Sequence, residues 1–318
     1  MAGEVVLGEV LEEAFAGAED SGGVTAVMTS RKIKIALASG KGGTGKTMLA
    51  VNLASYLSQK KKTLLIDLDV EEPNDFLFVK GEVVGISESY KMIPEWDESR
   101  CNLCGICSAV CNFHAVIQLG DYIAIFNELC HSCHACSELC PKGALPMKQH
   151  KMGEIKTISN GNLTLVESRL TVGEEQAVPL INQTHDHVQE NYGDFLFQIF
   201  DCPPGTACPM AASVKKADFV VLVTEPTPFG LHDLKLAAET VAGLSIPFGV
   251  VINREGIGNG DVEKYCFENH VPVMAHIPFD KEIAILYSKG QLLVDNYETL
   301  LPSFNQIMDH IENGVYMS

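Results

Sequence analysis

Short apolar runs alternate with stretches of helical periodicity from residue 31 onward. Because the runs lack strict polar–apolar alternation, they are typical of strands that are buried on both faces of a sheet. The predicted strands are Ile33–Ala38, Thr63–Leu68, Phe195–Phe200, Phe219–Val223, Phe248–Ile252 and Val271–Ile277. The predicted helices are Lys46–Gln59, Leu231–Ala242, Asp261–Asn269, Lys281–Ser288 and Leu301–Ile311. This order predicts a doubly wound α/β fold with a mostly parallel sheet.

The pattern is interrupted between Tyr90 and Gln149, where eight of the eleven cysteines lie. A segment at Ala115–Phe126 predicts a small hairpin that turns at Leu119-Gly120-Asp121. We interpret the interruption as a small domain inserted in a surface loop, where insertion disturbs folding least. The predicted division is a tail that is disordered or forms one short amphipathic helix (1–30), an α/β domain (31–89 and 150–318) and an inserted α+β domain (90–149).

Composition narrows the classes of function. Of the 318 residues, 46% are hydrophobic and 20% are charged, which is ordinary for a folded soluble protein. The net charge of −18 disfavours binding to nucleic acid or to an anionic membrane. No apolar run approaches the roughly 20 residues of a membrane span. Since the N-terminus has no export signal, we expect a cytoplasmic protein without a stable membrane anchor. Because disulfides are rare in the cytosol, we expect the cysteines to be metal ligands or redox groups.

A glycine-rich segment after the first strand fits the phosphate-binding pattern G-x-x-x-x-G-K-T and opens a helix. Its backbone N–H groups and the helix dipole are suited to bind phosphate. Lys46 is expected to contact the β- and γ-phosphates, and the Thr47 hydroxyl is expected to bind Mg²⁺. The predicted nucleotide-binding residues are Gly40, Lys41, Gly42, Gly43, Thr44, Gly45, Lys46 and Thr47.

The full motif, Lys-Gly-Gly-Thr-Gly-Lys-Thr, resembles the deviant Walker A sequence of the ATPase family that includes MinD, ParA partition proteins and the nitrogenase iron protein. The resemblance covers roughly Arg31–Asp75 and Phe195–Ser318. It implies ATP and Mg²⁺ as ligands and a homodimer that forms on ATP binding. It further implies that Lys41 crosses the dimer interface to the partner's nucleotide.

Other elements of this family follow in order along the chain. The resemblance implies that Asp69 orients the attacking water, so that Lys41, Lys46 and Asp69 are the predicted catalytic residues. Asp67 is expected near the magnesium, with a helix or turn cap as the alternative. Asp201, in a segment that resembles Walker B, is expected to hold Mg²⁺ through water. Asn253 resembles the adenine-reading asparagine, with a loop cap as the alternative, and Pro278 belongs to the segment beside the base.

The inserted cysteines form two runs with the same C-x2-C-x2-C-x3-C spacing, which resembles a bacterial ferredoxin with two 4Fe–4S clusters. In that fold the fourth cysteine of each run serves the other cluster. The resemblance therefore implies one cluster on Cys101, Cys104, Cys107 and Cys140, and the other on Cys130, Cys133, Cys136 and Cys111. Zinc would favour paired C-x2-C knuckles with longer spacers. The proline expected after the fourth cysteine follows Cys140 but not Cys111.

Three cysteines remain outside the two runs. Cys266 lies in a predicted helix and is expected in the core. Cys202 lies within the predicted switch that senses the γ-phosphate. Cys208 follows it, and two interpretations stay open: a buried switch cysteine, or a surface cysteine that shares a bridging cluster with its twin in a dimer.

Together these features resemble one branch of the MinD/Mrp superfamily. The first functional interpretation is an ATPase whose homodimer switch gates electron transfer from the ferredoxin insert to an unidentified redox partner. The alternative is an Mrp-like carrier that delivers iron–sulfur clusters to an iron–sulfur partner protein. A third is a positioning ATPase like ParA or MinD. It is disfavoured by the acidic composition and by the absence of Lys and Arg from Leu301–Ser318.

Overall fold

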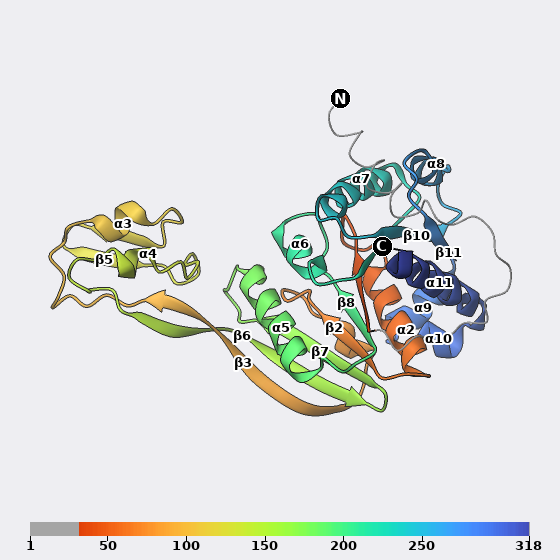
Figure 1. The fold of residues 1–318 in the computed structure, drawn as a ribbon, viewed down its shortest axis with the longest axis horizontal. Helices are drawn as coiled ribbons and strands as arrows, with labels where there is room; N and C mark the ends of the chain where they lie inside the picture. The colour runs from red at the N-terminus through yellow and green to blue at the C-terminus, as the bar shows by residue number, and fades with distance from the viewer. Residues whose placement is uncertain (1–31, 318) are drawn as a thin grey trace.

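The computed structural model describes residues 32–317, so the helix expected in the tail lies outside the described residues. A nine-stranded sheet has the order β11-β10-β9-β1-β8-β2-β7-β6-β3. The strands from β11 to β7 are parallel, and β6 and β3 are antiparallel at one edge (Figure 1). The bounds are β1 Ile33–Ala38, β2 Thr63–Asp67, β3 Glu82–Pro94, β6 Met147–Asn160, β7 Leu163–Leu170, β8 Phe197–Asp201, β9 Phe219–Thr224, β10 Phe248–Glu255 and β11 Val273–Pro278. The predicted mostly parallel α/β sheet is confirmed.

Helices cover both faces of the sheet. One face carries α2 (Lys46–Ser58), α9 (Lys281–Ser288), α10 (Leu293–Asn296) and α11 (Leu301–Met317). The other carries α5 (Ala177–Asn191), α6 (Cys208–Val214), α7 (Pro228–Gly243) and α8 (Asp261–Glu268). Along β1, Ile35 and Leu37 enter the first core, whereas Ala36 and Ala38 enter the second. Burial on both faces explains why the central strands are continuously apolar.

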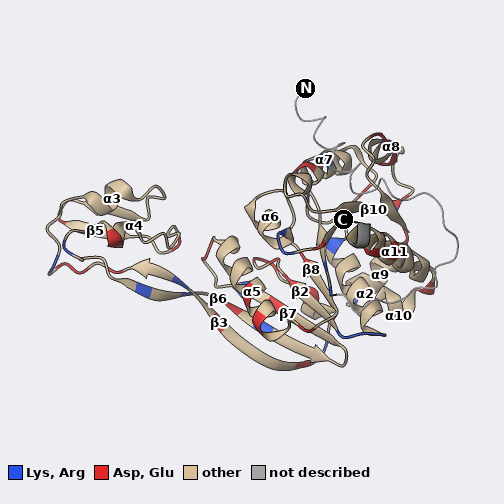
Figure 2. Ribbon diagram, viewed as in Figure 1, with Lys and Arg blue, Asp and Glu red and all other residues tan. Residues whose placement is uncertain are grey.

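The edge strands β3 and β6 form a long two-stranded ribbon, which the sequence pattern did not predict. They pair from Glu82↔Ser159 to Pro94↔Met147, so the predicted insert boundaries, 90 and 149, lie inside strands rather than in a loop. The ribbon has no continuous apolar run because much of it is exposed, and charged residues line it (Figure 2). Lys151, for example, pairs with Glu88 at 2.8 Å and with Glu154 at 2.6 Å. β7 and α5 were also missed.

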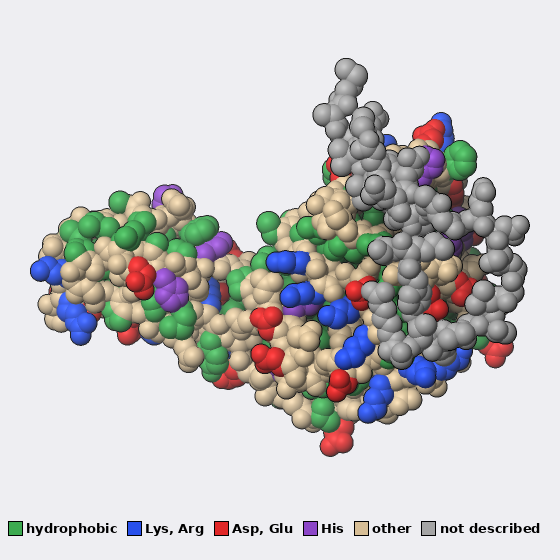
Figure 3. Space-filling view, viewed as in Figure 1, with side chains coloured by type: hydrophobic (Ala, Val, Ile, Leu, Met, Phe, Trp, Pro, Cys, Tyr) green, Lys and Arg blue, Asp and Glu red, His purple; other side chains and the backbone are tan. Residues whose placement is uncertain are grey.

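The far end of the ribbon carries a small lobe, residues 95–146, set apart from the rest of the described chain (Figures 1 and 3). It contains α3 (Ile106–Val110), β4 (Val116–Leu119), β5 (Tyr122–Ile125) and α4 (Ala135–Glu138). The predicted hairpin is confirmed, since β4 and β5 pair around Gly120, whose φ is +65°. The small core of the lobe mixes cysteines with Val116, Ile123 and Leu145.

No helix in the described part of the chain is both long enough and apolar enough to cross a membrane. Two 3-10 turns complete the elements, η1 at Asp75–Leu77 and η2 at Glu298–Leu300.

Candidate functional site

The glycine-rich loop lies between β1 and α2, at the carboxyl edge of the parallel sheet. A Cβ at Gly40 would lie 2.2 Å from the carbonyl oxygen of Asp233, so a larger residue cannot fit there. Gly45 has φ +92°, and its Cβ would meet the side-chain nitrogen of Asn253 at 2.1 Å. Both glycines are therefore required by close approach, and Gly45 also by its left-handed backbone.

Lys46, Thr47 and Asp201 form one buried cluster at this edge. The Lys46 ammonium lies 2.5 Å from Oδ1 of Asp201, and the Thr47 hydroxyl donates to Oδ2 at 2.7 Å. Burial acts to lower the pKa of Lys46, but the Asp201 carboxylate outweighs it and holds that pKa above its usual range. The two loop residues predicted to contact phosphate and Mg²⁺ are thus brought to the predicted magnesium carboxylate.

Asp67 ends β2 directly beside Asp201, its register partner on β8. Its Oδ1 accepts the N–H of Asp69 at 3.1 Å, and its Oδ2 accepts the N–H groups of Asn74 at 2.9 Å and Asp75 at 3.1 Å. These contacts correspond to the turn-cap interpretation of Asp67. Burial and the nearby Asp201 charge raise the pKa of Asp67 to about 8. The magnesium role of Asp67 stays a prediction.

Asp75 is a further acidic residue that the sequence reasoning missed. It is fully buried, and neither carboxylate oxygen has a hydrogen-bond partner among residues 32–317. Oxygen atoms of Asp67, Asp75 and Asp201 lie within 4.8 Å of one another, which is a donor set suited to a divalent cation. Burial, followed by the charges of Asp67 and Asp201, raises the pKa of Asp75 well above its usual range. The one sequence feature that pointed to Asp75 was its position, a few residues after Asp67 and Asp69 at the end of a predicted strand.

Lys41 lies at the outer side of the loop and is paired within its own chain. Its ammonium is 3.2 Å from Glu225, which follows β9 and also pairs with Arg254. Glu225 is nearly buried, whereas a third of the Lys41 side chain is exposed. Neither Glu225 nor Arg254 was singled out from the sequence. Asp69 is partly buried at the end of β2, and burial raises its pKa.

A cavity of about 280 Å³ opens beside the loop. Asn253 and Pro278, the two residues predicted to lie beside the base, both line it, together with Gly43, Met48, Phe279 and Tyr287. The Asn253 amide donates to the carbonyl of Thr44 at 2.7 Å, and its oxygen accepts the N–H of Arg254 at 2.9 Å. Asn253 therefore caps the glycine loop, as its alternative interpretation expects, while it also faces the cavity.

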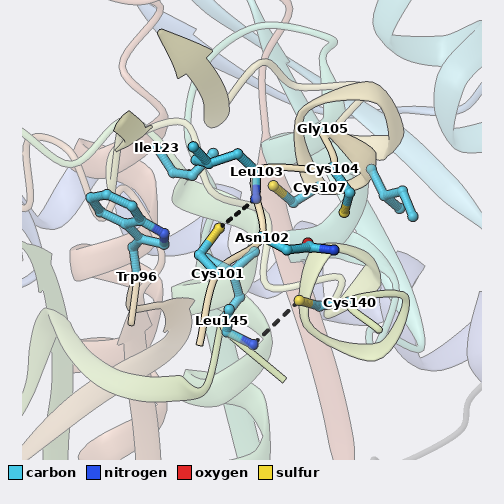
Figure 4. A pocket seen from close by; sticks show the side chains of 12 residues that line it. Trp96, Cys101, Asn102, Leu103, Cys104, Gly105, Cys107, Ile123, Cys140 and Leu145 are labelled. Carbon is cyan, nitrogen blue, oxygen red and sulfur yellow. Dashed lines mark hydrogen bonds between the residues drawn. The ribbon is translucent and has the colours of Figure 1, made fainter. Parts of the chain in front are cut away.

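The eight cysteines of the lobe separate into two groups of four. Cys101, Cys104, Cys107 and Cys140 line one pocket (Figure 4). Cys111, Cys130, Cys133 and Cys136 line the other. The fourth cysteine of each run thus lies with the first three of the other run, which is the crossed arrangement that the ferredoxin resemblance implies.

The backbone repeats between the two groups. Leu103 and Ser132, each two residues after the first cysteine of a run, have φ +57° and +54°. Gly105 and His134, each four residues after it, have φ +78° and +62°. The left-handed region costs an ordinary residue about 1 kcal/mol or more, so surrounding contacts must favour it. At the first pocket, the Leu103 N–H donates to the Cys101 sulfur at 3.4 Å (Figure 4).

Thiol chemistry is consistent with metal ligation. Burial raises the pKa of Cys107 and Cys130, and it raises the pKa of Cys136 to about 11. Without a metal these groups are therefore protonated thiols, whereas a bound metal ion would stabilise the thiolates. Four sulfur atoms facing one pocket form the donor set of an iron–sulfur cluster. The residues present therefore fit such a group.

The other cysteines differ in exposure. Cys266 is buried in α8, as predicted. Cys202 is buried beside Asp201, and burial raises its pKa. Cys208 is exposed at the start of α6, so the interpretation of Cys208 as a buried switch cysteine is wrong.

Comparison with known proteins identifies relatives over most of the chain. The family model described as CobQ/CobB/MinD/ParA nucleotide binding domain matches residues 35–294. An uncharacterized protein of Methanocaldococcus jannaschii is 32% identical over 289 residues, covering 89% of this chain and 96% of the relative. A protein named iron–sulfur cluster carrier protein, from Pyrococcus horikoshii, is 22% identical and covers 78% of this chain and 75% of its own length.

Among solved structures, the cell division ATPase MinD of Pyrococcus furiosus aligns with a TM-score of 0.54 at 20% identity. The alignment covers 89% of this chain and 99% of that one. The ATP complex of Cyanothece McdA(D38A) also aligns with a TM-score of 0.54, at 18% identity, and covers 91% of this chain and 98% of that one. At these identities the likeness concerns the fold.

Proposed function

The chain belongs to the CobQ/CobB/MinD/ParA nucleotide-binding family, and from this premise we propose that it is an ATP-hydrolysing iron–sulfur protein. In this proposal, ATP binding closes a homodimer, hydrolysis opens it, and the cycle gates electron transfer from the lobe at 95–146 to a redox partner. The lobe acts as a two-cluster ferredoxin, and the rest of the described chain acts as the ATPase.

One observation carries the proposal: the lobe with the two groups of four cysteines is attached to a ribbon whose strands, β3 and β6, belong to the nine-stranded sheet. β6 pairs with β7, which pairs with β2, the strand that ends in Asp67. The predicted electron carrier is therefore attached, without a linker outside the ribbon, to the hydrogen-bonded sheet that holds the predicted nucleotide switch. A cluster domain on a flexible linker would lack this connection.

The nucleotide site has a role for each residue. Lys46 binds the β- and γ-phosphates, and the Thr47 hydroxyl is a Mg²⁺ ligand. Asp201 holds the magnesium through water, with Asp67 close by. Asp69 orients the attacking water. The base lies in the cavity beside Asn253 and Pro278. The apolar lining by Met48 and Tyr287 suits an aromatic base.

The dimer is completed by Lys41, which leaves Glu225 and crosses to the partner's nucleotide. The exchange requires little energy, because Lys41 is partly exposed and Glu225 keeps Arg254 as a partner. Bound clusters would supply one-electron chemistry at each group of cysteines. The chain itself positions the sulfur atoms, supplies N–H groups to them and limits the access of water.

The lobe presents a surface for the redox partner. Figure 3 shows hydrophobic side chains across its visible face. The exposed hydrophobic residues of the lobe are Leu103, Ile106, Phe113, Leu119, Tyr122, Phe126, Leu129 and Leu139. Apolar side chains close to the exposed Cys104 and Cys133 would bring a partner's redox centre near the clusters.

A second candidate is an iron–sulfur cluster carrier. The names of relatives favour it: carrier proteins from Pyrococcus horikoshii and Aquifex aeolicus cover 78% and 82% of this chain, at 22% and 25% identity. The exposed Cys208 would then hold a labile cluster between two copies of the chain. Against it, Cys208-Pro209-Met210-Ala211 supplies only one cysteine of the paired C-P-x-C that such carriers use.

Two measurements on anaerobically purified protein test the proposal. It should contain about eight irons and eight sulfides per chain. Electron transfer to an artificial acceptor should change with Mg-ADP and with a non-hydrolysable ATP analogue. Zinc in place of sulfide would overturn the ferredoxin assignment. Identical rates in every nucleotide state, together with rapid cluster transfer to an apo-ferredoxin that Cys208→Ser abolishes, would favour the carrier.

A further inference from the structure

We propose that the nucleotide state is communicated to only one of the two cysteine groups, the one formed by Cys111, Cys130, Cys133 and Cys136, and that Gln176 is the positioning residue that carries it. This inference rests on the proposed function and specifies how it is regulated. The connection runs through residues 169–176, which leave the end of β7 and enter α5. We refer to these residues as the connecting segment.

The first end of the connecting segment is bound to the loop that follows Asp69. The N–H of Leu170 donates to the carbonyl of Val70 at 2.8 Å. The Arg169 guanidinium donates to the carbonyl of Pro73 at 3.3 Å and lies over the ring of Phe76. Loops that follow a switch acid have one arrangement around a γ-phosphate and another without it. A change in this loop therefore moves the end of β7.

The middle of the connecting segment is fixed to the ribbon by buried charges. The Glu174 carboxylate accepts from the Lys91 ammonium at 2.7 Å and lies 3.0 Å from Nε2 of His150. The side chains of Lys91 and Glu174 are only 3% and 4% exposed. Lys91 and His150 are register partners on β3 and β6, so one carboxylate holds both strands. Removing one partner of such a buried pair is costly, so the geometry is firmly specified.

The last residue of the connecting segment reaches the cysteine lobe. The Gln176 amide donates to the carbonyl of Glu128 at 3.0 Å and to that of Cys130 at 3.1 Å. Cys130 is the first cysteine of its run. On the other side of that cysteine, the Ser132 hydroxyl donates to the carbonyl of Met92 at 2.6 Å. The backbone that carries Cys130 is thus held between α5 and the ribbon.

The other cysteine group has no such connection. Among the hydrogen bonds and ion pairs of residues 32–317, none joins the backbone around Cys101, Cys104, Cys107 or Cys140 to the nucleotide-binding part. Their contacts are local, such as Leu103 N–H to Cys101 at 3.4 Å and Ala144 N–H to Cys140 at 3.3 Å. Movement of Gln176 therefore acts directly on the backbone of Cys130, whereas the other group is reached only through the shared core in which Cys107 and Cys136 pack. N–H···S bonds and water access near a cluster set its potential.

The test is an anaerobic redox titration of the full chain, followed by electron paramagnetic resonance, with Mg-ADP and with a non-hydrolysable ATP analogue. Cys133→Ser and Cys104→Ser, each altering one cluster's spectrum, assign the two signals. We expect the midpoint of the Cys130-containing group to shift and the other to stay. A tenfold preference of the ATP analogue for one redox state corresponds to a shift of about 59 mV. By reciprocity, the analogue's affinity must differ by the same factor between oxidised and reduced protein.

The decisive variant is Gln176→Ala, with Gln183→Ala as its matched control. Gln183 lies on α5, which begins directly after Gln176, and its amide donates to the carbonyl of Tyr90 on β3 at 2.9 Å. No hydrogen bond of the Gln183 side chain within residues 32–317 reaches the cysteine lobe. Gln176→Ala should abolish the nucleotide-dependent shift while nucleotide affinity and dimerisation persist, and Gln183→Ala should keep the shift. In cluster-free protein, hydrogen exchange of residues 128–132 should respond to nucleotide in wild type but not in Gln176→Ala.

The outcomes separate this inference from the function on which it rests. If one midpoint potential shifts with nucleotide in the wild type, and the same midpoint shifts equally in Gln176→Ala, the role proposed for Gln176 is wrong. The proposed gating of electron transfer by nucleotide is then retained. If both midpoints shift together, communication to a single group is wrong. If neither midpoint shifts although the protein dimerises with ATP, the redox gate fails and this inference fails with it.

Discussion

The ammonium of Lys46 lies 2.5 Å from Oδ1 of Asp201, so the lysine predicted to bind phosphate and the carboxylate predicted to hold magnesium form one ion pair. Both groups are buried, and the hydroxyl of Thr47 holds the second carboxylate oxygen. In the proposed function, binding of Mg-ATP replaces this ion pair with two others, from Lys46 to phosphate and from Asp201 to the metal. Removal of either partner therefore affects both ligand binding and the folded state.

Lys46→Ala should abolish tight Mg-ADP binding in calorimetry, because it removes the positive charge that contacts the phosphates. It should also lower the free energy of unfolding by about 3–5 kcal/mol, since Asp201 stays buried without its partner. The exposed Lys62 provides a control, and Lys62→Ala should change stability by no more than about 0.5 kcal/mol. Wild-type affinity in Lys46→Ala would contradict the nucleotide site.

Lys41→Ala should bind nucleotide as a monomer with little change but should fail to dimerise with ATP. The loss of its pair with Glu225 should cost less than about 1 kcal/mol, because Lys41 is partly exposed and Glu225 keeps Arg254. Light scattering after gel filtration, with and without a non-hydrolysable ATP analogue, measures dimer formation. Normal dimers and normal turnover in this variant would show that Lys41 does not act across an interface.

Asp69→Ala should bind ATP and remain as a closed dimer, because the water is no longer oriented for attack. Hydrolysis should fall by about 100-fold or more. Glu72→Ala, an exposed acid three residues later, serves as the control and should keep its rate. Phosphate release and the dimer lifetime are the measurements. A dimer of Asp69→Ala that opens at the wild-type rate would count against this role.

Cys111→Ser should damage the cluster predicted on Cys130, Cys133 and Cys136, and Cys140→Ser should damage the other one. The reason is the crossed grouping of the two runs around their pockets. Iron content and the two paramagnetic signals report the losses separately. Cys208→Ser lies outside both pockets and should keep both signals. The crossed assignment would be contradicted if Cys111→Ser lost the signal of the cluster on Cys101, Cys104 and Cys107. It would likewise be contradicted if Cys140→Ser lost the signal of the cluster on Cys130, Cys133 and Cys136.

Acid should unfold the protein partly through His185. Burial, with the charges of Lys216 and Lys34, lowers the pKa of His185 to about 4 from its usual 6.5. A base with a lowered folded pKa binds more protons when unfolded, so its contribution is complete above pH 6.5 and is lost as pH falls toward 4. The loss amounts to about 3 kcal/mol.

His185→Gln should remove that part of the pH dependence, which urea titrations at several pH values would measure. The exposed His232 is the control, and His232→Gln should leave the profile unchanged. An equally steep loss of stability in His185→Gln would show that other groups cause it.

The parallel sheet and the glycine loop were predictable because each is encoded locally. Ile35 and Leu37 lie in a continuous apolar run, and residues 40–47 carry a motif of fixed spacing. The grouping of the cysteines came from resemblance. The ribbon was missed, since its exposed residues follow neither a buried-strand nor a helical pattern. α5 was missed because the polar residues Thr184 and His185 occupy two of its buried positions.

The contacts of Asp75 and Glu225 could not be predicted for a different reason. Asp75 reaches Asp201 only because β2 and β8 are neighbours in the sheet. Glu225 reaches Lys41 only because β9 lies beside β1. Both contacts join residues more than a hundred positions apart, so strand order determines them. Single-sequence periodicity carries no information on that order.

The pairing of Pro94 with Met147 determines how the lobe is attached to the sheet. These residues face each other across an antiparallel ladder, so the chain leaves the ribbon and returns to it within one strand spacing, about 5 Å. A tight turn of two residues spans the same gap. A plain hairpin with such a turn could therefore replace the lobe without any rearrangement of the nine-stranded sheet. The sheet thus imposes a single requirement on the lobe, which is that its two ends lie side by side.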